Sequence, residues 1–592
     1  MKHPMRRSDN SKAVADSYRS GIRKRRKLKF GVVAVIASLA LVAAACGSDD
    51  DDDATPDATP EVTTTTQAPA ATEATTTSTA APSGGGGDAG EEGSGSSEGS
   101  GEETPSEESA PECPPYQDDR GGIFQDFQNE FDRCHPFQSL DAFCMPHAAT
   151  AVERVATDPG ITADSISIVH LRTTLEDLVS IGFGVPIGDP TKMFETFAWY
   201  VNNVCGGVNG RMLDLSLVEV PANAPDVDAL RNAACIEATE DSEAVLVLNS
   251  TGFQGSANLC IVEDHYSAFI STQGQLAEWV ERGEGRLVTL SPTLDESGRF
   301  LVQWLLQTGE LEGKTIGVVV PDTPGQQEAA EAGLVDPLEE AGFEIAVFDV
   351  LGCGGGPTCI EGMSESVSNM IDNDVDVLLP GLNVISLPQY LAEMVRQGFE
   401  PGDITFYNSD FNSQAGNLVT SKIVQFGQAP AGELYNGTII VDDADTAAYI
   451  APDYEQSAFN KMCYDTYLEY HENVPGNEDL DDPPHDPRDP DQNSAYGMVA
   501  TVCTEMRVAL RALYDAGPNP TREDIYAALE NLGAIDSNNM LPFSIRPGKS
   551  QASDAVHTTR FTYPCEAGER YATEHDTCIV DIENDEWVLV ER

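Results

Sequence analysis

Basic residues are scarce in this chain. Its 592 residues include 34 Lys and Arg against 98 Asp and Glu, which gives a formal net charge of −64. Eleven of the basic residues lie in the first 46 positions, so the remainder carries about −73. Contact with nucleic-acid phosphates requires a basic surface, and the composition therefore excludes a general nucleic-acid-binding protein. The same acidity mildly disfavours an anionic ligand, unless local donors override the average field.

Metal-binding and catalytic motifs are also lacking. The chain has no C-x-x-C pair and no H-E-x-x-H sequence, the close-set patterns typical of zinc sites. A G-x-S-x-G match at 95–99 lies in a stretch too polar to supply the strand and helix this motif needs. The P-loop-like stretch at 309–315 is one residue short between its glycines, and the acidic stretch at 479–491 lacks the glycine and spacing of an EF-hand. We therefore expect no enzyme, no metal and no cofactor.

The N-terminal region has the pattern of an export signal. A basic stretch at 23–29 precedes an apolar run at 30–45, whose sixteen residues are fewer than the roughly 20 of a membrane-spanning helix. Small residues then precede Cys46 and Gly47, which resembles a bacterial lipobox; an ordinary cleavable signal is the alternative. A lipid on Cys46 would anchor the protein to the extracytoplasmic face of the cell membrane.

Two segments without a recognisable α/β pattern follow. Residues 47–110 are rich in Asp, Thr, Gly, Ser and Glu and almost free of large apolar side chains, so we expect a disordered tether. Residues 111–160 form a Cys-rich extension with Cys113, Cys134 and Cys144 among several phenylalanines. This extension is either a small disulfide-stapled cap on a lobe or a partner-binding segment.

The cysteine content agrees with export. Setting Cys46 aside leaves twelve cysteines, an even number compatible with six disulfides in an oxidising compartment. The sequence does not fix their connectivity. The most plausible pairs are Cys353–Cys359, Cys565–Cys578, Cys205–Cys235 and Cys463–Cys503, with Cys113, Cys134, Cys144 and Cys260 left over.

The segment from Asp189 to Val220 sets the pattern for the rest of the chain. Asp189 is a candidate helix N-cap with Pro190 at the first helical position, and apolar residues recur at helical spacing as far as Val204. Gly206 and Gly207 end the helix, and an apolar strand follows after a short turn. Helices and strands then alternate, which predicts parallel sheets covered on both faces. The other expected strands are 166–171, 244–248, 267–270, 286–290, 315–320, 344–350, 375–379, 404–407, 437–441, 558–563 and 578–590. Helices are expected at 226–238, 298–308, 326–341, 361–371, 387–398, 454–470, 494–516 and 521–532.

Residues 202–211, NNVCGGVNGR, resemble the N-x-x-GG-I-N-G-R segment of type I periplasmic binding proteins, in the Leu/Ile/Val branch of ABC-transporter solute-binding proteins. The resemblance extends over about 161–592. It implies two doubly wound parallel-sheet lobes that are joined by three crossovers and hold a ligand in the cleft between them. On this basis 161–294 would begin the first lobe, 295–441 form the second, 442–533 complete the first, and 534–592 supply strands near the hinge or second lobe.

Loop residues directly after strands are the candidate ligand contacts, because ligands bind beyond the carboxyl ends of parallel strands. The family resemblance places Ser250 and Thr251 at a ligand carboxylate and Ser271 and Thr272 in the next ligand loop. Each hydroxyl could equally be an ordinary cap or turn residue. The full set of candidates is Ser250, Thr251, Ser271, Thr272, Asp322, Thr323, Asn383 and Asp410.

The chain departs from amino-acid binders of this family at two points. Thr323 and Pro324 stand where an aromatic is usual, and Ser386 stands where an acid would pair the ligand ammonium, although Asp322 or Asp410 could supply that charge. The resemblance therefore implies an importer subunit that delivers a small polar organic solute, such as an amino acid, amide or short-chain acid, to an ABC permease. The alternatives are a sensor that feeds a signalling partner, and a surface protein with a vestigial cleft.

Overall fold

The computed structural model describes residues 152–592, apart from positions 185, 223, 225, 355, 410–415, 445–455, 457, 478–487, 489–491, 536, 539–542, 569, 583–587 and 590–592. The predicted signal, lipidation site Cys46, tether and most of the Cys-rich extension lie outside the described residues. Within the described part, no helix combines the length and the apolar character needed to cross a membrane.

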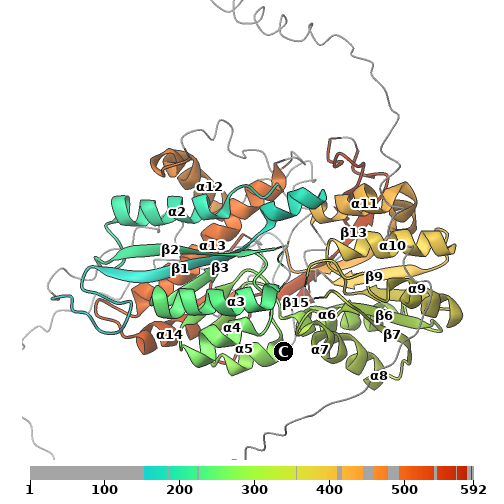
Figure 1. Cartoon of the computed structure of the whole chain (residues 1–592), viewed down its shortest axis with the longest axis horizontal. Helices are drawn as coiled ribbons and strands as arrows, with labels where there is room; N and C mark the ends of the chain where they lie inside the picture. Colours follow the sequence, from blue (N-terminus) through green and yellow to red (C-terminus); the bar gives the residue numbers. More distant parts are fainter. Residues whose placement is uncertain are drawn as a thin grey trace, which may run out of the picture. The chain divides into compact units, whose positions relative to one another are not determined.

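A five-stranded parallel sheet forms the first lobe, in the order β2-β1-β3-β4-β5 (Figure 1). Its strands are β1 (Ser165–Thr174), β2 (Met212–Pro221), β3 (Leu246–Asn249), β4 (Ala268–Ser271) and β5 (Leu287–Thr289). The connecting helices are α2 (Pro190–Tyr200), α3 (Val227–Ile236), α4 (Ala257–Leu259) and α5 (Ala277–Arg282), with shorter turns η2 (Leu175–Ile181), η3 (Val201–Cys205), η4 (Glu237–Asp241) and η5 (Cys260–Asp264). The central strands are buried on both faces, as their continuous apolar runs predict.

The unit predicted around Asp189 forms as expected. The Asp189 side chain accepts a hydrogen bond from the Lys192 backbone N–H, and the chain turns left-handed at Gly206 after a π-helical turn. Gly207 also has a positive φ of 82°, and a Cβ there would lie 2.0 Å from the Arg211 carbonyl oxygen. The tight return from helix to β2 therefore requires glycine at this position.

The second lobe contains a sheet in the order β14-β13-β10-β9-β8-β6-β7. Strands β6 to β10 run parallel, whereas β13 is antiparallel to β10, β14 and β15. The strands are β6 (Ile316–Pro321), β7 (Ile345–Leu351), β8 (Val377–Pro380), β9 (Thr405–Ser409), β10 (Ile439–Asp442), β13 (Ala555–Thr562), β14 (Cys578–Asp581) and β15 (Val588–Leu589). The single strand expected at 578–590 is thus two short strands.

Helices cover both faces of the second sheet. They are α6 (Leu294–Thr308), α7 (Gln326–Ala330), η6 (Glu331–Val335), α8 (Asp336–Glu340), α9 (Met363–Asp372), α10 (Ser386–Gln397) and α11 (Asn417–Tyr435). The first four pack with one apolar core and α9 to α11 with another, on the opposite face (Figure 1). The sequence patterns gave no element for α11, whose backbone leaves helical geometry at Gln428 just before Pro430.

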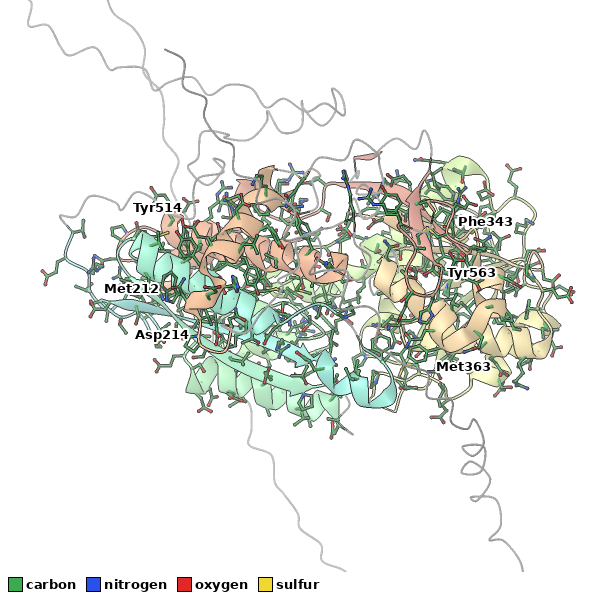
Figure 2. The ribbon with its side chains drawn as sticks, turned by 90° about the horizontal axis from the view of Figure 1, so that it is seen from above. Met212, Asp214, Phe343, Met363, Tyr514 and Tyr563 are labelled. Carbon is green, nitrogen blue, oxygen red and sulfur yellow. A yellow bond between two sulfur atoms is a disulfide. The ribbon has the colours of Figure 1, made fainter. Side chains whose placement is uncertain are left out.

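The last helices return to the first lobe. Helices α12 (Ala458–Tyr470), α13 (Asn493–Asp515) and α14 (Arg522–Glu530) pack with α2 on one face of the first sheet, whereas α3 to α5 cover the other face. Figure 2 labels Met212, Asp214 and Tyr514 in this lobe, and Phe343, Met363 and Tyr563 in the second. The fold class, two parallel-sheet α/β lobes, is confirmed.

The chain between 532 and 552 also packs on the first lobe. Strands β11 (Gly533–Ala534) and β12 (Ser544–Ile545) pair with each other, and Ile535, Phe543 and Ala552 join the apolar core of α12 to α14. Only the chain from β13 onward enters the second sheet, whereas we expected all of 534–592 near the hinge or the second lobe.

Four disulfides join cysteines of the described residues. Three of them are the predicted pairs Cys353–Cys359, Cys463–Cys503 and Cys565–Cys578. The predicted pair Cys205–Cys235 is wrong, because Cys235 bonds to Cys260. The fold places α3 against the α4–η5 segment and brings the Cys235 and Cys260 sulfurs together. Cys205 is also disulfide-bonded.

Candidate functional site

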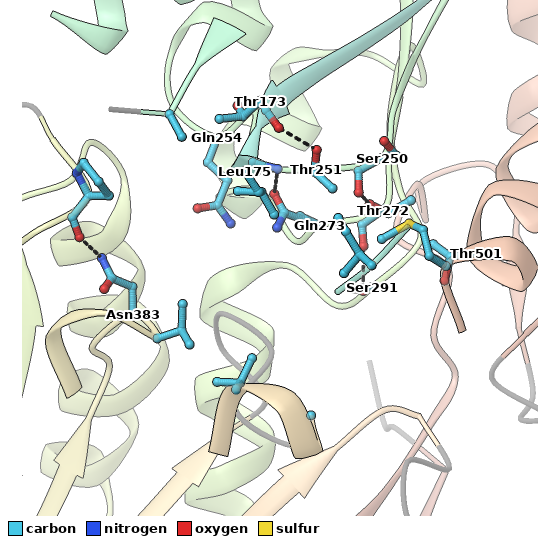
Figure 3. Close-up of a pocket in the computed structure, with 18 of the residues that line it drawn as sticks. Thr173, Leu175, Ser250, Thr251, Gln254, Thr272, Gln273, Ser291, Asn383 and Thr501 are labelled. Atoms are coloured by element: carbon cyan, nitrogen blue, oxygen red, sulfur yellow. Dashed lines mark hydrogen bonds between the residues drawn. The ribbon is translucent and has the colours of Figure 1, made fainter. Parts of the chain in front are cut away.

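A cavity of about 750 Å³ is lined by residues of both lobes. Many of these residues lie in loops at the carboxyl ends of parallel strands, where α/β folds bind ligands. Six predicted ligand residues are among them: Ser250, Thr251, Thr272, Asp322, Thr323 and Asn383. Figure 3 shows Ser250, Thr251 and Thr272 together on the first-lobe wall, with Asn383 apart from them on the second-lobe wall.

The other two candidates, Ser271 and Asp410, are not among the described residues that line the cavity. Ser271 is fully buried and is not among the lining residues; its hydroxyl lies 3.2 Å from the Asn249 Oδ1 atom and 3.0 Å from the Gln273 carbonyl oxygen. Successive strand residues face opposite ways. The Thr272 side chain therefore reaches the cavity, whereas the Ser271 side chain points into the lobe. Asp410 lies outside the described residues.

The hydroxyls on the first-lobe wall are engaged within the protein. The Thr251 hydroxyl donates to the Thr173 carbonyl at 3.0 Å, and the Thr272 hydroxyl donates to the Ser250 carbonyl at 3.0 Å (Figure 3). The Ser250 Oγ atom lies 2.9 Å from His170 Nε2. Thr251 and Thr272 can therefore accept hydrogen bonds from a ligand but do not donate hydrogen bonds to it.

Two buried titratable groups lie beneath this wall. Burial, with a smaller contribution from Arg172, lowers the pKa of His170 to about 3, so its imidazole is neutral. Glu505 on α13, one helical turn after the lining residue Thr501, is fully buried, and burial raises its pKa well above the usual value. Both shifts favour the uncharged form of the groups beneath the first-lobe wall.

The candidate residues of the second lobe also form hydrogen bonds with the backbone of neighbouring loops. Asn383 donates from Nδ2 to the Pro357 carbonyl at 2.9 Å, and its Oδ1 accepts from the Ile385 and Ser386 backbone N–H groups. The Asp322 carboxylate accepts from the Cys353 backbone N–H at 2.8 Å. Ser386, which stands at the expected acidic position, is fully buried, and its hydroxyl accepts from the Cys359 backbone N–H. These contacts shape the cavity wall without requiring a ligand.

Two cationic side chains that we did not predict also line the cavity. Arg231 on α3 donates to Asp228 and to the Gly252 carbonyl, and its Nε has no partner in the described part of the chain. Lys422 on α11 is only 4% exposed. Arg231 falls in the helix predicted at 226–238, which follows the loop at the end of β2, and this position could have marked it. Lys422 gave no such signal because α11 was not predicted.

Apolar side chains fill the mouth of the cavity between the lobes. Leu178, Phe183 and Ala222 from the first lobe cluster with Ile385 from the second. The Phe183 ring stacks on Phe426 of α11, with centroids 6.0 Å apart. The site thus combines an apolar patch with a few polar groups, a composition typical of small-molecule sites.

Comparison with solved structures identifies the fold. A solute-binding protein of an R. palustris ABC transporter, solved with 4-hydroxybenzoate, superposes with a TM-score of 0.50 over 72% of this chain and 97% of that one, at 12% identity. The chain has the type I periplasmic binding protein fold. This agrees with the sheet orders and with the cavity between two parallel-sheet lobes.

Other periplasmic binding proteins are similar at lower scores. A fatty acid ABC transporter substrate-binding protein from Thermomonospora curvata is 17% identical, with a TM-score of 0.47 over 74% of this chain and 95% of that one. The isoleucine-bound branched-chain amino acid binding protein of Streptococcus pneumoniae is 12% identical, with a TM-score of 0.46 over 72% of this chain and all of that one. No family model and no curated protein matches the sequence.

Proposed function

We propose that this protein, which has the type I periplasmic binding protein fold, is the solute-binding subunit of an ABC importer. It would capture a small organic molecule between its lobes. The observation that carries the proposal is the cavity of about 750 Å³, which both lobes line at the carboxyl ends of their strands. Its size lies within the range of small-molecule sites, which argues against a vestigial cleft. The 4-hydroxybenzoate-bound R. palustris protein uses the same fold to bind a solute.

Contacts across the cavity mouth indicate how a ligand would be enclosed. Gln326 of α7 donates to the Gln254 side chain of the first lobe at 3.5 Å, and Gln425 of α11 donates to the Gly182 carbonyl at 3.4 Å. A ligand that touches both walls adds contacts that exist only when the lobes are together. Such differential contacts are what can shift the population towards the closed state.

A cavity-filling variant tests this proposal. Val419→Trp on α11 would place a large ring in the cavity, whereas Val204→Trp alters an exposed position away from it. In a thermal-shift screen of amino acids, amides, organic acids, polyamines and sugars, we expect a ligand at about 100 times its Kd to stabilise the wild type by about 2.7 kcal/mol. Val419→Trp should abolish the shift and Val204→Trp retain it. A shift that persists in Val419→Trp would locate the site elsewhere, and the absence of any hit on folded protein would contradict the function.

We propose further that a lipid on Cys46 holds the protein at the extracytoplasmic face of the membrane, beside its permease. The small residues before Cys46 and the apolar run of 30–45 support this placement. Cys46→Ser, expressed in a bacterium with a lipoprotein pathway, should move the protein from the membrane fraction to the soluble fraction. Ser48→Ala, which lies beside the lipobox and keeps Cys46, serves as the control. An unchanged membrane fraction for Cys46→Ser would refute the anchor.

A further inference from the structure

The first-lobe wall is poorly equipped to receive a carboxylate through its hydroxyls. The Thr251 and Thr272 hydroxyl protons are donated to the Thr173 and Ser250 carbonyls. Since a carboxylate only accepts hydrogen bonds, it gains no proton from either side chain while these contacts hold. Unused donors among the described cavity residues are instead the Arg231 Nε group, whose guanidinium is already paired with Asp228, and side chains of α11.

Lys422 is a buried cation without a counter-ion among the described residues. Its ammonium donates to the Gln425 side chain at 2.7 Å and lies 5.5 Å from the centre of the Phe183 ring. No carboxylate of the described part lies within 4.0 Å of it; Glu574, the acid that acts on its pKa, is an exposed side chain. Desolvation lowers the pKa of Lys422. A buried ammonium is costly unless an anion pairs with it, so this side chain favours an anionic partner.

Asn417, in the first turn of the same helix, is a second unused donor. It lines the cavity, is 4% exposed, and accepts from the Ile579 backbone N–H at Oδ1. Its Nδ2 group is buried and has no hydrogen-bond partner in the described structure. Asn417 and Lys422 both line the cavity and lie five residues apart on the same helix. The positive end of the α11 dipole adds to the preference for an anion there.

The other ionisable groups of the cavity wall have partners within the protein. Asp228 is paired with Arg231, and the Asp322 carboxylate accepts from a backbone N–H group. Asp443 accepts a hydrogen bond from Ser553, and burial together with Asp442 raises the pKa of Asp443 to about 7. The mouth beside Lys422 is apolar, with Phe183, Val384 and Ile385.

On the basis of the proposed function, we infer that the solute is an organic acid with one carboxylate and an apolar body, and that α11 receives the carboxylate through Lys422 and Asn417. One ammonium and one amide suit a single carboxylate better than a dianion. The apolar body would lie against the cluster around Phe183 at the cavity mouth. The highly acidic chain would thus bind an anion because local donors outweigh its average charge.

Two variants separate this inference from a merely structural role for α11. Lys422→Met removes the charge and keeps a long apolar stem beside Phe183. Asn417→Asp keeps the acceptor for the Ile579 N–H group and replaces the donor with a second oxygen. Lys461→Met, at an exposed lysine on α12, is the matched control.

Calorimetry on the full chain would use benzoate, octanoate, their amides, leucine, putrescine and glucose. We expect an acid to bind at least about tenfold more tightly than its amide. Lys422→Met and Asn417→Asp should each weaken acid binding between about tenfold and a hundredfold, without affecting the amide. Circular dichroism would verify that each variant is folded.

Each other result has a distinct meaning. Tight binding of leucine, putrescine or glucose that Lys422→Met leaves unchanged would overturn the inference and retain the binding function. Equal affinity for an acid and its amide would also overturn the inference about the carboxylate and retain the binding function. A folded protein that binds none of the compounds would overturn both.

Discussion

Replacing Arg211 with methionine should lower the free energy of unfolding by about 3 to 5 kcal/mol. Arg211 is 1% exposed, yet its guanidinium makes four hydrogen bonds. It donates from Nε to the Thr162 carbonyl, from Nη1 to the Pro518 carbonyl, and from Nη2 to the Val155 carbonyl and the Asn519 side chain. Methionine fills similar space but leaves these acceptors without their donor, and a buried unsatisfied group costs more than a lost bond.

The consequence should extend beyond one side chain. Arg211 ties the segment before β1 to the turn between α13 and α14, so its loss should also loosen the N-terminal edge of the first lobe. Urea unfolding followed by circular dichroism measures the change. Arg282→Met, which removes a half-exposed arginine paired with Glu263, should have a much smaller effect, because exposed ion pairs contribute little to stability. Similar losses for the two variants would show that the buried network contributes little.

Arg211 also shows why the sequence predicted the fold well. In the motif 202–211, Asn202 bonds to both backbone groups of Leu213, Gly207 permits the turn, and Arg211 closes the return. Each of these contacts is local or joins the α/β unit to its own lobe. The motif therefore specifies the architecture of a type I periplasmic binding protein and carries no information about the solute.

The site was harder to predict, for reasons that particular residues make clear. Six of the eight candidate residues line the cavity, because the position of strand-end loops follows from the parallel sheet alone. Tertiary contacts decide which polar groups of a wall residue remain free to bind a ligand. The Thr251 hydroxyl, for example, donates to the carbonyl of Thr173 on another strand. Lys422 lies on α11, where Gly427 and Pro430 interrupt the apolar periodicity. The Cys235–Cys260 disulfide likewise depends on helix packing rather than sequence spacing.

Replacing Glu505 with glutamine should stabilise the protein, and the gain should grow as the pH rises. Glu505 is fully buried in the first lobe, and neither of its carboxyl oxygens has a hydrogen-bond partner among the described residues. Burial raises the pKa of this carboxyl well above its ordinary value of 4.5, and the nearby Asn249 backbone offsets this only in part. The folded protein therefore keeps a proton that the unfolded chain releases above about pH 4.5.

The sign of the effect follows from proton linkage. Where the folded state binds more protons than the unfolded state, the free energy of unfolding falls with rising pH, by about 1.4 kcal/mol per pH unit for one group. This fall begins above the unfolded pKa and ends at the raised folded pKa. Glutamine is neutral in both states, so the Glu505→Gln protein lacks this contribution to the slope.

Other groups also change stability with pH, but their contributions cancel in the comparison of the two proteins. Neutral His170, with a pKa lowered to about 3 from 6.5, costs stability as the pH falls below 6.5. Asp443, with a pKa raised to about 7 from 3.8, costs stability as the pH rises between these values. Both are present in the wild type and in the variant, and the difference between the two proteins isolates Glu505.

Urea unfolding of both proteins from about pH 5 to about pH 8 measures this difference. We expect it to grow in favour of the variant as the pH rises, by no more than about 1.4 kcal/mol per pH unit, until the pH reaches the raised folded-state pKa of Glu505. Glu281→Gln, at an exposed position on α5, should stay within about 0.5 kcal/mol of the wild type throughout.

A constant difference would mean that Glu505 ionises alike in the folded and unfolded states. A variant less stable at every pH would show instead that the carboxyl makes a contact glutamine cannot replace, and the wall beneath Ser250 would then be held by a charge rather than by a neutral core.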